Sequence, residues 1–209
     1  MPVEAKPLYR PDVLRPLLSN FQMPRSLEAQ RPKLAHWSNL LESGRIDDLN
    51  EREILPDFLT DIFCGVLGYC GPAAATERFT FSREKYVPVE GEFADAVLGV
   101  FDGDRKQFVV ALEGKGPKDP LDRPYGGRRL SAVEQAYRYA INLPCDWIIV
   151  TNIRQIRLYH KSSDQQTYEL FETQRLASDE SHLRKLVYLL SADRVVPQTG
   201  RCHFHELLS

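Results

Sequence analysis

The middle of the chain alternates between apolar and polar positions with the period of a β-strand. Residues 86–102, "YVPVEGEFADAVLGVFD", and residues 105–116, "RKQFVVALEGKG", are rich in Val and Phe and flank the turn-forming pair Asp102-Gly103. This pattern predicts a β-hairpin. The short apolar run at 146–152 predicts a buried strand, and the alternation at 155–161 predicts an outer strand paired with it.

Other segments repeat their apolar residues with helical spacing instead. Pro56 is expected to kink or interrupt one of these helices, and Gly68 is expected to end it. The order of helix, strand hairpin, helix, strand, strand and helix predicts an α/β (α+β) domain with a mixed central sheet flanked by helices. The predicted helices span residues 33–43, 47–69, 131–142 and 178–191.

The first 34 residues contain six prolines, a composition that disfavours a long helix. We therefore expect residues 1–44 to form a proline-rich N-terminal arm on the surface with one short helix. Residues 45–209 are then expected to form the main domain.

Composition narrows the class of protein. Of the 209 residues, 43% are hydrophobic and 27% are charged, and the net charge of −2 argues against a strongly basic nucleic-acid scaffold. No apolar run approaches the roughly 20 residues that span a bilayer, and the start lacks an apolar signal segment, so we expect a cytoplasmic protein. The four cysteines are scattered, and "RCHFH" at 201–205 lacks a second ligand pair, which makes it a poor zinc site.

The predicted hairpin carries acids at positions where a sheet core favours apolar side chains. If the chain turns near residues 102–104, Asp95 and Glu113 come side by side as cross-strand neighbours, about 5 Å apart. Two carboxylates this close repel each other unless a proton or a cation lies between them, and Mg²⁺ takes such oxygen ligands. Lys115 lies two residues after Glu113, so its side chain is expected on the same face of the strand, where it can orient a metal-bound water. The alternative for each residue alone is a solvated side chain near a turn.

An Asp followed on the next strand by Glu-x-Lys resembles the motif of the PD-(D/E)XK nuclease superfamily, with Ala94 in place of the usual proline before the Asp. The resemblance implies a restriction-endonuclease-like fold in which Asp95, Glu113 and the backbone carbonyl of Gly114 bind Mg²⁺, with Mn²⁺ as a substitute. It implies that Lys115 positions the attacking water and that the products carry 5′-phosphates. Gln135, in a Q-x-x-x-Y motif with Tyr139, would support the lysine or the DNA.

A narrower resemblance covers residues 45–209. "NEREILPDFLTDIFCGVLGY" and "DWIIVTNIRQIRLYH" look like parts of the N-terminal endonuclease region of type IIG restriction–modification enzymes. It implies a fragment of a longer protein, with methyltransferase and specificity regions fused downstream. It also implies a catalytic acid on the first helix, Glu51, with Glu53 or Asp57 as alternatives. The non-functional alternative is a solvated acid that interacts favourably with the helix dipole.

The loop between the predicted hairpin and the next helix has local positive charge. A flexible basic loop beside an acidic metal site can hold a phosphate backbone, although a solvated loop is the ordinary alternative. The nucleic-acid-binding residues we predict are Lys118, Arg123, Arg128, Arg129 and, through its motif, Tyr139.

The sequence therefore predicts a Mg²⁺-dependent DNA endonuclease domain of a restriction–modification system that acts on double-stranded DNA. If two copies must meet to cut both strands, the active form is a dimer. One alternative is a non-catalytic DNA-binding or assembly domain on a nuclease scaffold. Another is the nuclease part of a motor-type (type I or III) restriction subunit, which shares the chemistry and differs in what is fused downstream.

Overall fold

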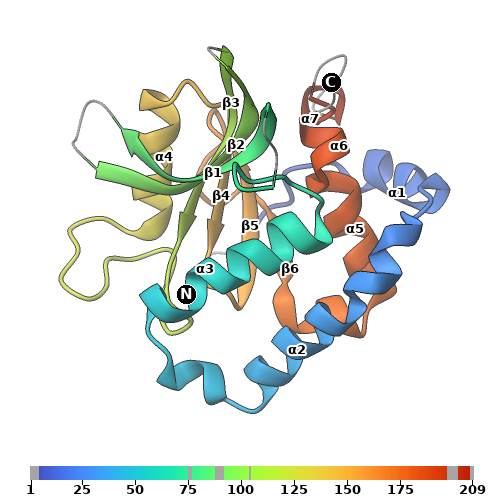
Figure 1. The fold of residues 1–209 in the computed structure, drawn as a ribbon, viewed down its shortest axis with the longest axis horizontal. Coiled ribbons are helices and arrows are strands. Elements are labelled where there is room, and N and C mark those ends of the chain that lie inside the picture. Colours follow the sequence, from blue (N-terminus) through green and yellow to red (C-terminus); the bar gives the residue numbers. More distant parts are fainter. Residues whose placement is uncertain (1–4, 75–76, 88–91, 104, 197–201, 208–209) are drawn as a thin grey trace.

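A six-stranded mixed sheet forms the centre of the protein, as Figure 1 shows. The computed structural model describes residues 5–74, 77–87, 92–103, 105–196 and 202–207. The strands follow one another in chain order across the sheet, and every neighbouring pair is antiparallel except β3 and β4, which are parallel. The strands are β1 (Arg78–Val87), β2 (Glu92–Asp102), β3 (Arg105–Gly114), β4 (Trp147–Thr151), β5 (Gln155–His160) and β6 (Glu169–Glu172).

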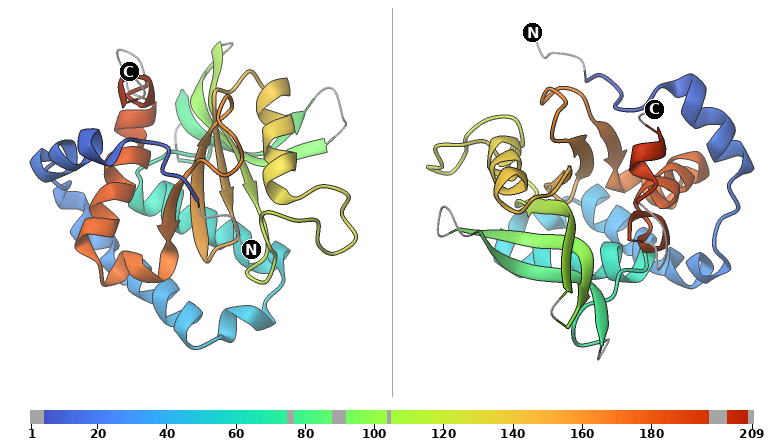
Figure 2. Two further views of the ribbon diagram at one scale, coloured as in Figure 1. Left: turned by 180° about the vertical axis from the view of Figure 1, so that it is seen from behind. Right: turned by 90° about the horizontal axis from the view of Figure 1, so that it is seen from above.

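Helices cover both faces of this sheet, which confirms the predicted mixed sheet flanked by helices. Figures 1 and 2 show α4 on one face and α2, α3 and α5 on the other. The α-helices are α1 (Pro11–Asn20), α2 (Arg31–Glu42), α3 (Glu51–Leu59), α4 (Ala132–Asn142), α5 (Glu180–Leu190), α6 (Ala192–Val195) and α7 (Phe204–Leu207). The chain also contains the short 3₁₀ helices η1 (Arg25–Gln30), η2 (Arg45–Asp48) and η4 (Thr173–Ala177) and the π-helical segment η3 (Thr60–Val66), which follows α3 directly.

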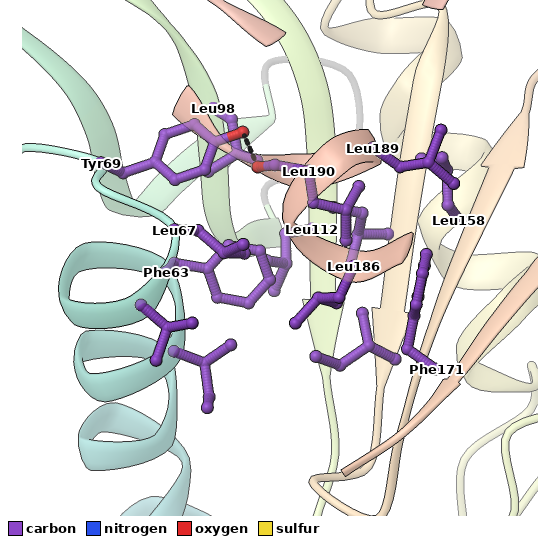
Figure 3. Close-up of a cluster of buried hydrophobic side chains, with 14 of the residues drawn as sticks. Phe63, Leu67, Tyr69, Leu98, Leu112, Leu158, Phe171, Leu186, Leu189 and Leu190 are labelled. Carbon is purple, nitrogen blue, oxygen red and sulfur yellow. Dashed lines mark hydrogen bonds between the residues drawn. The ribbon is translucent and has the colours of Figure 1, made fainter. Parts of the chain in front are cut away.

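Alternate residues of β3 enter two separate apolar cores, as the two-residue period of a strand requires. Val110 and Leu112 pack in the core under α2, α3 and α5, whereas Ala111 packs under α4. Figure 3 shows part of the larger core, where Phe63 and Leu186 meet between the η3 and α5 segments. The buried hydroxyl group of Tyr69 donates a hydrogen bond of 2.9 Å to the Leu190 carbonyl oxygen, so its polar atom is satisfied.

The N-terminal segment is more structured than the sequence predicted. Pro11 begins α1 at a position where a helix does not need its N–H, and the helix runs for ten residues although Pro16 lies inside it. Tyr9, Leu14 and Leu27 are buried in the larger core together with residues of the sheet and α5. The expectation of an arm lying only on the surface was therefore wrong for this part of the segment, because these apolar side chains help to cover the core.

Pro56 has the local effect that the sequence suggested. It lies inside α3, its carbonyl oxygen accepts a hydrogen bond of 2.8 Å from Thr60 Oγ1, and the helix changes to π-helical geometry at Thr60. Gly68 follows with φ of 78°, a conformation that favours glycine, and no helix continues beyond it.

The predicted strand over 86–102 divides between two strands. Val87 ends β1 and Glu92 begins β2, while positions 88–91 and Asp104 of the predicted turn lie outside the described residues. The sequence did not predict most of β1, nor β6, and it treated α7 as part of a tail. Within the described ranges, no helix is long and apolar enough to cross a membrane.

Candidate active site

The register of the β2–β3 pair brings the two predicted acids together. Ala96 lies opposite Leu112 and Val97 opposite Ala111, so continuing the register by one residue places Asp95 opposite Glu113. The Gly114 N–H donates a hydrogen bond of 2.7 Å to Asp95 Oδ2. At the end of the β2–β3 pairing, a main-chain N–H thus donates to a side-chain carboxylate and not to a carbonyl oxygen of the neighbouring strand.

Glu113 and Lys115 form a buried ion pair at the end of β3. Their exposed fractions are 1% and 5%, and Lys115 Nζ donates a hydrogen bond to Glu113 Oε1. The other oxygen, Glu113 Oε2, is buried and has no hydrogen-bond donor among the residues that the structure describes. The Asp95 and Glu113 carboxyl groups are close enough to hydrogen-bond each other once one of them is protonated.

Burial and proximity shift the pKa values of all three groups. Burial raises the pKa of Glu113 well above its usual value, and the neighbouring Asp95 raises it further. Burial also raises the pKa of Asp95. For Lys115 burial lowers the pKa, but the attraction of Glu113 and Asp95 outweighs this and leaves the pKa raised. The lysine therefore stays charged, and the two acids favour holding a proton between them unless a cation takes its place.

Helix α3 supplies the third predicted acid. Asn50 caps this helix and forms a capping box with Glu53, whose carboxylate accepts the Asn50 N–H. Asp57 is exposed. Glu51 instead accepts a hydrogen bond of 3.2 Å from the Gly116 N–H and adds to the negative field at Lys115. Of the three alternatives, Glu51 is the one that the fold brings to Gly116 and Lys115.

The position of Glu51 depends on a close contact between α3 and β3. A Cβ atom on Gly114 would lie 2.6 Å from both Cδ atoms of Leu55, so this approach requires a glycine unless Leu55 moves.

Glu84 was not predicted from the sequence as a residue of the site. This residue lies opposite Asp95 in the β1–β2 register, has the unusual φ of 49° for a non-glycine residue, and raises the pKa of Asp95 by its charge. Glu84 and Asp95 line one cavity of about 400 Å³ together with Arg83, Leu55, Pro56 and Leu59. The alternation of "RFTFSREKYV" was the available signal for β1, but nothing in the sequence indicated the backbone conformation of Glu84.

The two residues of the predicted supporting motif on α4 hydrogen-bond to each other. The Gln135 amide donates a hydrogen bond to the Tyr139 hydroxyl group, and no contact of Gln135 with Lys115 is found in the described part of the chain. Tyr139 is only 1% exposed and packs in the core under α4. The expectation that Tyr139 contacts nucleic acid is therefore corrected, because its ring is inside the protein.

The basic loop divides into two parts. Lys118 and Arg123 are exposed. Arg128 forms an ion pair of 2.5 Å with Asp119, and its Nη1 lies 4.0 Å from Glu51 Oε2, which places it beside the acids. Arg129 is exposed and lines a pocket that also contains Gln135.

The donors at Asp95 and Glu113 fit a magnesium ion that is completed by water and substrate. Glu113 Oε2 is a buried oxygen with no donor among the described residues, and the charge of the neighbouring Asp95 carboxylate raises the pKa of Glu113. Within the described residues no group of three or more His, Cys, Asp or Glu is arranged to hold a metal. Mg²⁺ nevertheless commonly uses one or two carboxylates together with waters and phosphate oxygens, so the pair suffices for that ion.

The "RCHFH" segment does not present a competing metal site in its described part. His203 is buried, and its Nδ1 lies 2.9 Å from the Arg194 carbonyl oxygen. Burial lowers the pKa of His203 to about 4, so the ring is neutral near neutral pH.

Comparisons with protein-family models, with curated proteins and with solved structures found no match to this chain. The resemblance to PD-(D/E)XK nucleases therefore stays a prediction that depends on the residues described above.

Proposed function

We propose that the chain is a Mg²⁺-dependent endodeoxyribonuclease domain that hydrolyses phosphodiester bonds. The observation that carries this proposal is the contact of Asp95, Glu113 and Lys115 at the end of the β2–β3 pair, where Glu113 and Lys115 are withdrawn from water and Asp95 is half-buried beside them. Unpaired buried carboxylates are costly, and perturbed pKa values of this kind concentrate at functional sites.

Asp95 and Glu113 would hold the ion, with the Gly114 carbonyl as a further ligand. A bound Mg²⁺ lowers the pKa of a coordinated water and neutralises charge on the phosphate. The Lys115 ammonium, kept charged by its neighbours, orients the attacking water and balances the charge that develops on the phosphate oxygens. Water forms the new P–O bond as the bond to the 3′ oxygen breaks, which leaves a 5′-phosphate and a 3′-hydroxyl and releases one proton to solvent.

Glu51 supports the same chemistry from α3. Its carboxylate accepts a hydrogen bond from the Gly116 N–H and adds negative charge beside Lys115. This charge favours cation binding and keeps Lys115 protonated.

Double-stranded DNA is the substrate class that the basic loop fits. Lys118, Arg123 and Arg129 are exposed beside a site that needs a phosphate ligand. The assignment to a restriction–modification system, with methyltransferase and specificity regions fused downstream and dimerisation for double-strand cleavage, rests on the sequence resemblance. A motor-type restriction subunit would use the same residues.

One observation favours a second candidate, a non-catalytic DNA-binding or assembly domain. The Lys115–Glu113 ion pair, together with a proton shared by Glu113 and Asp95, satisfies the cluster without a metal. A nuclease scaffold that has lost its cation affinity would contain the same contacts.

Metal titration and cleavage separate these two candidates. We expect the full chain to bind Mn²⁺ in isothermal titration and to convert supercoiled plasmid DNA to nicked or linear forms with Mg²⁺ or Mn²⁺. Asp95→Ala should lose both properties, whereas Asp12→Ala, an exposed acid on α1, should keep both. Equal weak heats for the wild type and Asp95→Ala would contradict the nuclease proposal and favour the non-catalytic domain.

A further inference from the structure

A second, strongly basic pocket lies at the start of α4. It has a volume of about 390 Å³ and is lined by Arg128, Arg129, Leu130, Gln135 and Arg138. Pockets that bind small ligands commonly fall in the range of about 300–1,000 Å³. The size is therefore sufficient for a phosphate group with part of an attached sugar.

The chemistry of the lining selects an anion. Three arginines and one glutamine are among the residues that line the pocket, and its described lining includes no carboxylate, although Arg128 also pairs with Asp119. Arg129 and Arg138 are exposed, and Arg138 also makes a contact within the protein, which a ligand in the pocket would share or exchange. Guanidinium groups bind phosphate oxygens through paired hydrogen bonds, and three of them favour a phosphate over a weaker acceptor.

Arg128 connects this pocket to the candidate active site. The same side chain that lines the pocket pairs with Asp119 at 2.5 Å and approaches Glu51 to 4.0 Å. Glu51 in turn accepts the Gly116 hydrogen bond beside Lys115. A phosphate in the pocket would therefore lie near the acids but outside the pair that would hold the metal.

We propose that this arginine pocket binds a phosphate group of the nucleic acid other than the scissile one. The nucleic-acid part of this inference rests on the proposed function, whereas phosphate binding itself does not. The ligand is either an internal phosphodiester or the phosphate monoester at a strand end, because both present the oxygens that guanidinium groups bind. A monoester carries more negative charge than a diester and would gain more from three arginines.

Phosphate binding can be measured without any metal. The full chain is titrated in EDTA with inorganic phosphate and with two short single-stranded oligonucleotides of one sequence, one with a 5′-phosphate and one with a 5′-hydroxyl. The test variant is Arg129→Gln/Arg138→Gln, which removes two charges and leaves Arg128 on Asp119. The control is Arg15→Gln/Arg25→Gln, which removes two exposed charges from α1 and η1, on the side of the molecule away from α4.

We expect saturable phosphate binding that is weakened about tenfold or more in the test variant and unchanged in the control. The slope of log affinity against log salt for the oligonucleotides should become shallower by about 0.7, the change expected when one phosphate contact on a single strand is lost. A preference for the 5′-phosphorylated strand that disappears in the test variant identifies a strand-end phosphate. Equal binding of both strands, weakened equally in that variant, identifies an internal phosphate.

The proposal is overturned if phosphate binding does not saturate, or if the test and control variants bind all three ligands alike. Circular dichroism shows whether the variant is folded, and Arg129→Lys/Arg138→Lys, which keeps the charge, should restore part of the affinity. Cleavage without phosphate binding would reject the pocket and keep the nuclease. Phosphate binding without cleavage would reject the nuclease and keep the pocket.

Discussion

In the core between the sheet and α5, Phe171 and Leu186 are fully buried among other apolar side chains, whereas at the end of β3 Glu113 and Lys115 are buried almost as completely. The first kind of burial stabilises the fold by about 25 cal/mol for each Å² of apolar surface withdrawn from water. The second kind costs free energy unless the charges are paired, and Glu113 Oε2 has no donor in the described structure. The same strand thus stabilises the fold through Val110 and Leu112, whereas the buried charges at its end destabilise it. We infer that the polar end is retained for what it does rather than for stability.

The sharpest test of this contrast is Lys115→Met, which removes the charge and keeps the volume. Because the ammonium would stabilise developing charge, cleavage should fall by about 10²–10³-fold. The melting temperature should fall as well, because Glu113 then stays buried without its partner, so cleavage is compared at a temperature at which both proteins are folded. Plasmid cleavage and thermal unfolding are measured on the same preparation. Retained cleavage would show that the lysine has no part in the chemistry.

Leu186→Ala tests the apolar side of the comparison. Leu186 is completely buried, so its truncation should leave a cavity and lower the free energy of unfolding by about 2–5 kcal/mol. Urea denaturation measures this loss. Metal binding per folded molecule should stay unchanged, and a loss of metal affinity without a loss of stability would contradict the separation of core and site.

Gly114→Ala tests the contact that joins the two regions. The new Cβ would meet Leu55 at 2.6 Å, and the strain should lower the free energy of unfolding by about 1–3 kcal/mol. Leu55→Ala removes the atoms that clash, so the double variant should lose less than the sum of the two single losses. A double-mutant cycle in urea measures this coupling, and simple additivity would show that the contact does not set the spacing.

Asp95→Asn should have the smallest effect on stability, and unlike the other variants it should stabilise the protein. The folded state raises the pKa of Asp95, so between the ordinary and the raised pKa the folded protein binds more protons than the unfolded chain. Stability from this group is therefore full below the ordinary pKa and is lost as the pH rises through the raised one. The variant should melt about 2–4 °C higher than the wild type at mildly alkaline pH, roughly the shift that 1 kcal/mol gives in a chain of this size.

A pH series of melting temperatures without divalent ions checks this sign. The difference between Asp95→Asn and the wild type should shrink toward acidic pH. A variant that melts lower than the wild type at every pH would mean that the acid contributes to stability and that the contrast with the core is wrong.

Local patterns were sufficient to predict the elements with strong periodicity. The helix at 131–142 and the strands at 146–152 and 155–161 appear nearly as expected, because capping by Ser131 and continuous apolar runs are properties of short segments. Strand β6 has four residues, too few for a reliable period, and the proline count in the first 34 residues concealed α1 because Pro11 occupies a position that a helix tolerates.

The candidate site was predictable where it depended on register and unpredictable where it depended on tertiary packing. Strand parity and one turn were enough to expect Asp95 beside Glu113. The choice of Glu51 over Glu53 or Asp57 depends on how α3 meets Gly114, and Tyr139 is buried because of what α4 covers. Neither fact is encoded in a local pattern.

The parallel pairing of β3 with β4 has a consequence for how such a chain can change. Parallel neighbours require the chain to travel back along the whole length of the sheet, and here that return carries the exposed residues 122–127 before α4 begins. Lengthening a flexible surface segment costs little, because closure entropy grows only with the logarithm of its length. Insertions into this connection could therefore change which ligand the loop contacts, while the β2–β3 pair and its acids keep their positions.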